Sequence, residues 1–167
     1  IKKYAENGIF YVLLILISIT SLFSITPFFF NYSSFLLPEK YILNLKDMGD
    51  GSFQAAEFLN KLPDAQNMTI WSDKGAVCET FVGACKTNFN KNDTLGFDFD
   101  YFVVSTGRKS RSLKLQLSAD FDPPINFERL YSTNLDQADF EIRFGNNPNN
   151  FVRVMQTEKI LKHPQLP

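Results

Sequence analysis

The most prominent pattern along the chain is an uncharged, mostly apolar stretch over residues 8–30. A helix rises 1.5 Å per residue, so this stretch would extend roughly 35 Å and cross a hydrocarbon core of about 30 Å. Pro27 is expected near the helix end, and Phe28 and Phe29 are typical of an aromatic belt at the membrane interface. We therefore predict a transmembrane helix within residues 1–30, with a buried core helix as the alternative.

Two basic residues, Lys2 and Lys3, precede the apolar stretch. The positive-inside tendency predicts a cytoplasmic N-terminus in the cell membrane, with residues 31–167 outside the cytoplasm. Because the chain begins with Ile1 rather than Met, we expect it to be cut from a longer protein. Earlier membrane helices of that protein would then be partners of this one, together with the lipid bilayer.

The rest of the chain alternates between helical and strand-like patterns. Apolar residues recur at helical spacing over residues 52–62 and 76–82, and Ser52 is expected to cap the first of these helices. Apolar runs or alternation predict six strands, at residues 68–72, 97–105, 113–117, 127–132, 140–144 and 151–155, with residues 145–150 as the turn of a hairpin. The expected fold class is α/β, with α+β left open.

This pattern divides the chain into four parts. Residues 1–30 carry the membrane helix, and residues 31–50 form a juxtamembrane connection. Residues 51–158 are predicted to form a small exterior domain, in which two helices pack on a mixed β-sheet. Residues 159–167 form a tail.

Composition then narrows the chemistry. The chain has 17 Lys and Arg against 18 Asp and Glu, so it lacks the basic excess of a nucleic-acid-binding protein. One His and two Cys cannot build a Cys/His zinc site, and His163 lies in the predicted tail, away from any nucleophile. We expect no catalytic residue and no cofactor in this segment.

The two cysteines, Cys78 and Cys85, lie seven positions apart. An exterior location permits a disulfide, and a turn at Gly83 would bring the two residues within bonding range. Two free thiols are the alternative. A redox-active pair normally has a CxxC spacing, which this pair lacks.

Two further clusters are candidates for binding. Asp98 and Asp100 form a DxD pattern that would place both carboxylates on one face of a strand, although ordinary strand alternation gives the same pattern. It is a weak metal candidate, and we predict no metal site elsewhere. Arg108, Lys109 and Arg111 follow the predicted central strand and would attract lipid phosphates or a phosphorylated substrate. A solvated turn is the alternative.

Several short motifs occur in an order that resembles the C-terminal end of a known enzyme family. They are Phe30-Asn31-Tyr32, Gly49-Asp50-Gly51, the AAEFLN helix at residues 55–60, the LPDA turn at 62–65, the MTIWS strand at 68–72 and the DYFVV strand at 100–104. In this order they resemble the last membrane helix and exterior domain of bacterial membrane glycosyltransferases related to the protein O-mannosyltransferases.

The resemblance implies that the parent protein is an enzyme that transfers a sugar from a polyprenyl-phosphate carrier. The catalytic carboxylate of these enzymes lies far upstream, so the exterior domain would cap the site or position the acceptor. Leu36 and Leu37 lack the glycines that usually follow in the family, and the cysteine pair is not a general family feature. The alternative is a single-span, membrane-anchored binding or structural module, such as a pilin-like or sensor ectodomain.

Overall fold

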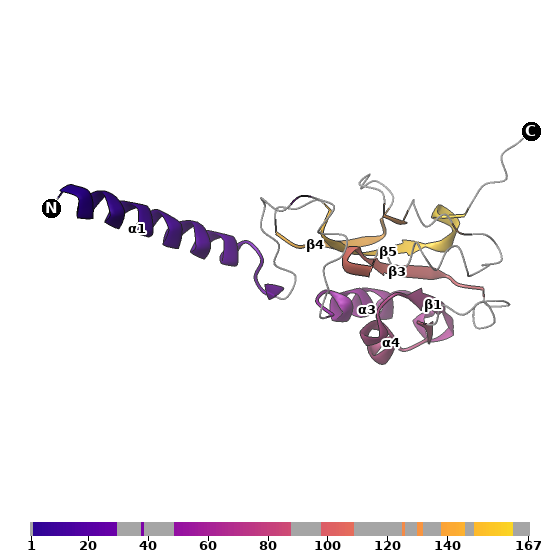
Figure 1. Cartoon of the computed structure of the whole chain (residues 1–167). Helices are drawn as coiled ribbons and strands as arrows, with labels where there is room; N and C mark the ends of the chain where they lie inside the picture. The colour runs from indigo at the N-terminus through magenta and orange to yellow at the C-terminus, as the bar shows by residue number, and fades with distance from the viewer. Residues whose placement is uncertain are drawn as a thin grey trace, which may run out of the picture.

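The computed structural model describes residues 2–29, 38, 49–87, 98–108, 125, 130–131, 138–145 and 149–161, with residues 2–7 and 108 described by their backbone alone. An N-terminal helix, α1 (Lys2–Phe23), extends away from a domain that is built on a β-sheet (Figure 1). In this domain the helices are α3 (Ser52–Asn60) and α4 (Gly75–Thr80), and short 3-10 turns are η2 (Ala65–Asn67), η3 (Thr106–Arg108) and η5 (Thr157–Lys159). The strands are β1 (Thr69–Ser72), β2 (Ala84–Lys86), β3 (Tyr101–Ser105), β4 (Phe140–Arg143) and β5 (Phe151–Gln156).

The five strands form one mixed sheet in the order β2-β1-β3-β5-β4. Strand β1 pairs in parallel with β2 and β3, whereas β5 pairs antiparallel with β3 and β4. The predicted α/β fold with a mixed sheet is therefore confirmed, as is the hairpin of β4 and β5. Sequence analysis missed β2, because three residues that follow Gly83 carry no recognisable strand pattern.

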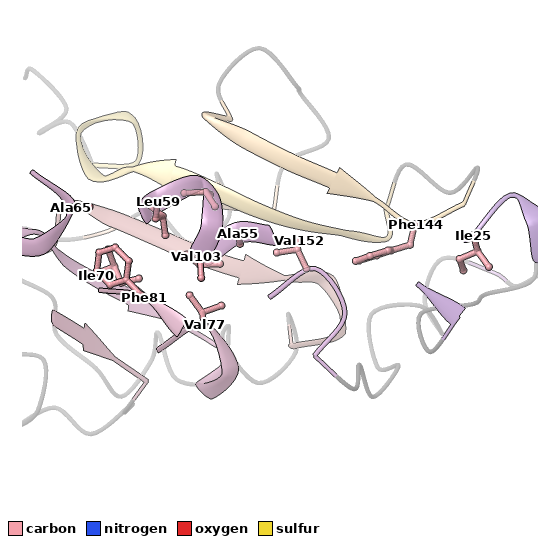
Figure 2. Packing of buried hydrophobic residues seen from close by; sticks show 12 residues of the cluster. Ile25, Ala55, Leu59, Ala65, Ile70, Val77, Phe81, Val103, Phe144 and Val152 are labelled. Atoms are coloured by element: carbon pink, nitrogen blue, oxygen red, sulfur yellow. The ribbon is translucent and has the colours of Figure 1, made fainter. Parts of the chain in front are cut away.

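Helices α3 and α4 cover one face of the sheet, which we call the helix-covered face (Figure 1). Ala55, Ala56 and Leu59 of α3 are fully buried against Val103 and Val152 (Figure 2). Small side chains let the helix approach the strands closely, so its backbone lies near the sheet. The helix-covered face is thus a continuous apolar core.

The opposite face of the sheet has a second apolar cluster. Trp71, Phe102 and Met155 are buried on it, together with Leu130 and Ile160 from outside the strands. Strand β5 accordingly alternates between the two faces and is buried on both, as its central position in the sheet requires. We call this second surface the opposite face.

Several sequence-based boundaries are wrong. Helix α3 ends at Asn60 rather than near residue 62, and β3 begins at Tyr101 rather than at residue 97. The N-cap of α3 is Gly51, in a left-handed conformation, and no side chain caps the helix. Ser52 is the first helical residue instead, so its hydroxyl does not satisfy the end as predicted.

Two predicted strands lie mostly outside the described residues. The segment 113–117 falls there completely, and so does most of 127–132. Leu130 and Tyr131 are described, and their backbone is helical and turn-like rather than extended.

Helix α1 is exposed along its length. From Ile9 to Phe23 its large apolar side chains are between 44% and 76% exposed, which contradicts the alternative of a helix buried in the core of this chain. The helix ends at Phe23, so the helical part of the predicted apolar stretch is shorter, at roughly 24 Å from Gly8 onward. Among residues with described side chains, no helix reaches the length and hydropathy needed to cross a membrane.

The turn that follows α1 contacts the domain. Ile25 is buried in the core of the helix-covered face, next to Phe144 at the end of β4 (Figure 2). The ring of Phe28 meets that of Phe144 edge-on, with 5.1 Å between the centroids. Two apolar contacts therefore fix which end of the domain is closest to α1.

Candidate functional site

The end of the sheet that lies near α1 is also where the parallel strands β1 and β3 end. A Cβ atom added to Gly51 would lie 3.1 Å from Phe144, so the start of α3 belongs to the same end. We call it the α1-proximal edge and define it by its polar residues, which are Asp50, Ser52, Ser72, Asp73, Lys74, Ser105 and Thr106. Strands β2 and β3 lie on opposite sides of β1, and in open α/β sheets such a switch point is where ligands bind.

A buried hydrogen-bond network joins the two strand ends. The carboxylate of Asp73 accepts hydrogen bonds from the backbone amide of Ser105 at 2.8 Å and from its hydroxyl at 3.2 Å. The amide of Asp73 donates to the carbonyl of Val103 at 3.1 Å. These contacts continue the pairing of β1 and β3 beyond the last sheet residues and hold the edge in place.

Lys74 connects this network to the start of α3. Its ammonium group donates to the carbonyl oxygen of Asp50 at 2.9 Å, and its backbone amide donates to the hydroxyl of Ser72 at 3.1 Å. Lys74 is itself buried, and a buried ammonium group needs such partners because desolvation is costly. The α1-proximal edge therefore combines a fixed cation with the positive N-terminal end of a helix.

Two buried atoms at the start of α3 have no hydrogen-bond partner among the described residues, and they are Oδ2 of Asp50 and the hydroxyl oxygen of Ser52.

The predicted basic cluster begins at the same edge. Arg108 ends η3, which follows β3 directly, and its backbone position is described. Lys109 and Arg111 lie outside the described residues. The structure thus places the start of the cluster, while its contact with phosphate stays a prediction.

The DxD residues lie at the other end of the sheet, before the start of β3. Asp98 and Asp100 are exposed, with Phe99 buried between them. The carboxylate of Asp100 accepts a hydrogen bond of 2.7 Å from the backbone amide of Thr69, which begins β1. In the part of the chain that is described, no three potential metal ligands gather. Asp100 therefore has a clear structural role in holding two strand starts together.

Tyr101 lies at this far end as well. Partial burial, followed by the negative charge of Asp139, raises the pKa of its phenol above the ordinary 10.0, while the ammonium group of Lys159 acts in the opposite direction. Lys159 and Asp139 are themselves joined by an ion pair of 2.6 Å. A phenol with a raised pKa stays neutral at physiological pH, so it packs here as an uncharged group.

The predicted disulfide is present. Cys78 in α4 and Cys85 in β2 are bonded, with 5.1 Å between their Cα atoms. The bond links α4 to β2, which is an edge strand of the sheet. The alternative of two free thiols is therefore wrong.

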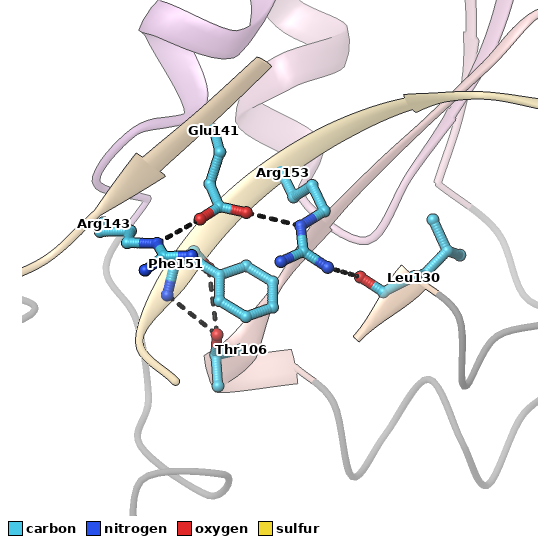
Figure 3. A network of polar contacts seen from close by, with 6 residues as sticks. All are labelled: Thr106, Leu130, Glu141, Arg143, Phe151 and Arg153. Carbon is cyan, nitrogen blue, oxygen red and sulfur yellow. Dashed lines mark hydrogen bonds and ion pairs between the residues drawn. The ribbon is translucent and has the colours of Figure 1, made fainter. Parts of the chain in front are cut away.

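Sequence analysis missed a buried ionic network on the opposite face (Figure 3). Glu141 of β4 accepts from the Nε atom of Arg153 on β5 at 2.7 Å and also pairs with Arg143. A second nitrogen of Arg153 donates to the carbonyl of Leu130 at 2.8 Å, and the guanidinium carbon lies 4.1 Å from the ring centre of Phe151. Arg153 is only 1% exposed.

This network ties the hairpin to Leu130, which is buried on the opposite face. Glu141 and Arg153 are direct partners in the register of β4 and β5, so knowledge of the hairpin register would have revealed the pair. The cluster satisfies internal charges and joins Leu130 to the sheet, which is a structural role.

Comparison of the chain with known protein families, with curated proteins and with solved structures found no match in any of the three.

Proposed function

We propose that this chain is the last membrane helix and the exterior, non-catalytic domain of an integral-membrane glycosyltransferase that uses a polyprenyl-phosphate-linked sugar. The observation that carries the proposal is the exposed apolar surface of α1, together with the contacts that Ile25 and Phe28, just after this helix, make with the domain. Such a surface is stable only when it is covered by lipid or by other apolar helices. Both would be available to the last helix of a polytopic enzyme in the cell membrane.

The glycosyltransferase assignment draws its support from the order of motifs. The Gly49-Asp50-Gly51 turn precedes α3, the LPDA turn follows it, and the MTIWS segment contains the whole of β1. This order of motifs along the sequence is what supports the assignment.

The α1-proximal edge gives the domain a means to act on a lipid-linked substrate. Arg108 leaves the sheet at the end of the domain closest to α1, where a lipid phosphate would lie. A basic cluster at that position would attract the phosphate of the carrier, while catalysis takes place elsewhere in the parent protein. The domain would then cap the site or position the acceptor outside the cytoplasm.

A single-span, anchored module with a binding or structural role is the second candidate, and the same exposed α1 favours it equally. The sequence upstream of Ile1 separates the two. Several further apolar spans with an acidic pair early in the sequence would favour the transferase, whereas a start codon or signal peptide within a few residues would contradict it.

The anchoring is tested with the full chain in phosphatidylcholine vesicles. We expect the chain to stay with the vesicles under alkaline extraction. Replacing Leu14 and Ile17 by Asp should release it, because a charge at the centre of a membrane helix costs about 2.5–3.5 kcal/mol. The control variant Leu14→Ala with Ile17→Ala should remain bound. Release of the unmodified chain would contradict the proposal.

The role of the basic cluster is tested by binding of radiolabelled polyprenyl phosphate to the purified full chain in detergent. Reversing Arg108 and Arg111 to Glu should abolish retention of the lipid. Lys61→Glu is the control, because Lys61 is an exposed cation just beyond the far end of α3. Equal retention of the lipid by the unmodified chain and by both variants would contradict this role and favour a solvated turn.

Incubation of the chain alone with a polyprenyl-phosphate sugar should give no transfer. Turnover would contradict the non-catalytic assignment.

A further inference from the structure

An exposed aromatic residue lies at the start of α3. Phe53 is 60% exposed, although its neighbours Ser52, Ala55 and Ala56 are buried. A single exposed apolar residue is common on protein surfaces and by itself indicates nothing. Phe53 is informative because of where it lies in the domain.

Phe53 belongs to the end of the domain that lies closest to α1. It follows Gly51 and Ser52, and a Cβ atom on Gly51 would lie 3.1 Å from Phe144. Phe144 contacts Phe28, which comes directly after the turn that ends α1. Figure 1 shows the same arrangement, with the first turn of α3 directed toward α1. If α1 is in the membrane, this turn lies near the interface.

The outer surface of α3 changes character along the helix axis. Phe53, Glu57 and Lys61 are spaced four residues apart and therefore share one side of the helix. Glu57 and Lys61 form an exposed ion pair of 3.1 Å at the far end, whereas the near end carries the aromatic ring. The polarity thus rises with distance from α1, as expected for a helix that enters a bilayer interface with its first turn.

Further aromatic residues lie on the same side of the boundary. Phe23 ends α1 and Phe29 follows the exit turn, and both are more than half exposed. Phe rings buried in the headgroup and acyl boundary bind it through their apolar area. The first turn of α3 would continue this aromatic zone onto the domain.

We propose that the first turn of α3 rests in the phospholipid interface, with Phe53 as the residue that inserts. This inference rests on the proposed membrane anchoring of α1 and adds a second contact, made by the domain itself. Two separate contacts with a membrane restrict the tilt of a domain more than a single contact does. The α1-proximal edge would then be held at the depth of lipid headgroups.

The test compares two Trp substitutions in the full chain, reconstituted into phosphatidylcholine vesicles that carry a nitroxide near the headgroup end of the acyl chains. Phe53→Trp reports on the near end of α3. Val82→Trp is the matched control, because Val82 is 54% exposed and its amide bonds to the side chain of Asn60, the last residue of α3. Native Trp71 is buried and gives the same background in both variants.

We expect the additional fluorescence of F53W to shift to shorter wavelength and to lose most of its intensity to the nitroxide. The additional fluorescence of V82W should keep its wavelength and intensity. Equal quenching of both variants would overturn the inference, because the domain would then lie on its side.

The chain could resist alkaline extraction while the fluorescence of F53W is not quenched. That result would also overturn the inference, but it would leave the anchoring intact. Extraction of the unmodified chain by alkali would contradict both the membrane anchoring and the insertion of Phe53. The urea unfolding midpoint of each variant, compared with that of the unmodified chain, checks that the substitutions leave the fold unchanged.

Discussion

The two faces of the same sheet are stabilised in different ways. The helix-covered face is apolar throughout, with Ala55, Ala56 and Leu59 packed on the valines of β3 and β5. The opposite face combines Trp71 and Phe102 with a fully buried arginine that is paired to Glu141. Strand β5 takes part in both, since Val152 and Val154 point to one face and Arg153 to the other.

The two faces show that burial alone does not determine whether a strand residue is apolar or charged. A face covered by a regular helix can be filled by apolar side chains. On the opposite face, the backbone carbonyl of buried Leu130 also needs a hydrogen-bond donor, and Arg153 supplies it. The buried charge therefore also satisfies a backbone group that lies outside the sheet.

The largest effect is expected from Arg153→Ala. The substitution leaves the carboxylate of Glu141 buried with only Arg143, and removing one partner of a buried ion pair costs about 3–5 kcal/mol. Urea unfolding of the full chain in detergent, followed by the fluorescence of buried Trp71, measures the loss. Arg143→Ala is the matched control and should cost about 1 kcal/mol or less, because Arg143 is partly exposed.

The double variant Arg153→Met with Glu141→Leu separates the loss of the ion pair from the cost of an unpaired buried charge. It removes both charges, and apolar replacement of a buried pair is often neutral or stabilising. We expect most of the stability lost in R153A to return. A double variant as unstable as R153A would show that Arg153 acts mainly through Leu130.

The next effect concerns the covalent bond beside the helix-covered face. Replacing Cys78 and Cys85 by Ala should lower the free energy of unfolding by about 2–3 kcal/mol, since the bond closes only a short loop. The same urea titration measures it, and a reducing agent should shift the unmodified chain but not the variant. No shift of the unmodified chain on reduction would contradict the expectation.

A smaller effect tests whether the two faces are equally well packed. Ile70 lies on the helix-covered face and Ile160 on the opposite one, and both are fully buried. Each Ile→Val substitution should cost about 0.5–1.5 kcal/mol, because it removes one buried methyl group. If I160V proves neutral in urea unfolding while I70V does not, the opposite face is loosely packed. Its stability would then come from the ion pair of Arg153 more than from apolar packing.

The smallest effect is a dependence on alkaline pH. The folded state raises the pKa of Tyr101 above 10.0, so it holds the phenolic proton more tightly than the unfolded chain does. This contribution to stability is complete below pH 10 and is lost as the pH rises through the folded pKa. Urea midpoints measured across this range should fall more steeply for the unmodified chain than for Tyr101→Phe. If the urea midpoints of the two proteins fall in parallel as the pH rises, Tyr101 makes no such contribution to stability.

Local patterns were sufficient for much of the fold. Alternation and a polar turn predict the hairpin of β4 and β5, because its contacts are close in sequence. The disulfide between Cys78 and Cys85 also follows from spacing and a turn at Gly83. The backbone at Gly83 lies so close to Ala65 that an added Cβ would be 2.4 Å from its carbonyl oxygen, which spacing alone does not reveal.

For the candidate site, the sequence identified Arg108 by its charge and by its place after a strand. It did not identify Asp73 or Lys74, because the value of these residues depends on β1 and β3 being parallel neighbours. It assigned the cap of α3 to Ser52 by residue type alone. Gly51, in a left-handed conformation, takes the N-cap position in its place, and the serine hydroxyl is buried at the first helical residue.

Local sequence patterns were enough to predict the apolar character of α1, the fold class and the position of the disulfide, since each depends on residues that are near one another in the chain. The order of the strands, the burial of Arg153 against Glu141 and the contact of Phe28 with Phe144 became visible only in the folded domain. These features join residues that are distant in sequence, and their free energy comes from desolvation and packing that exist only after the segments have met.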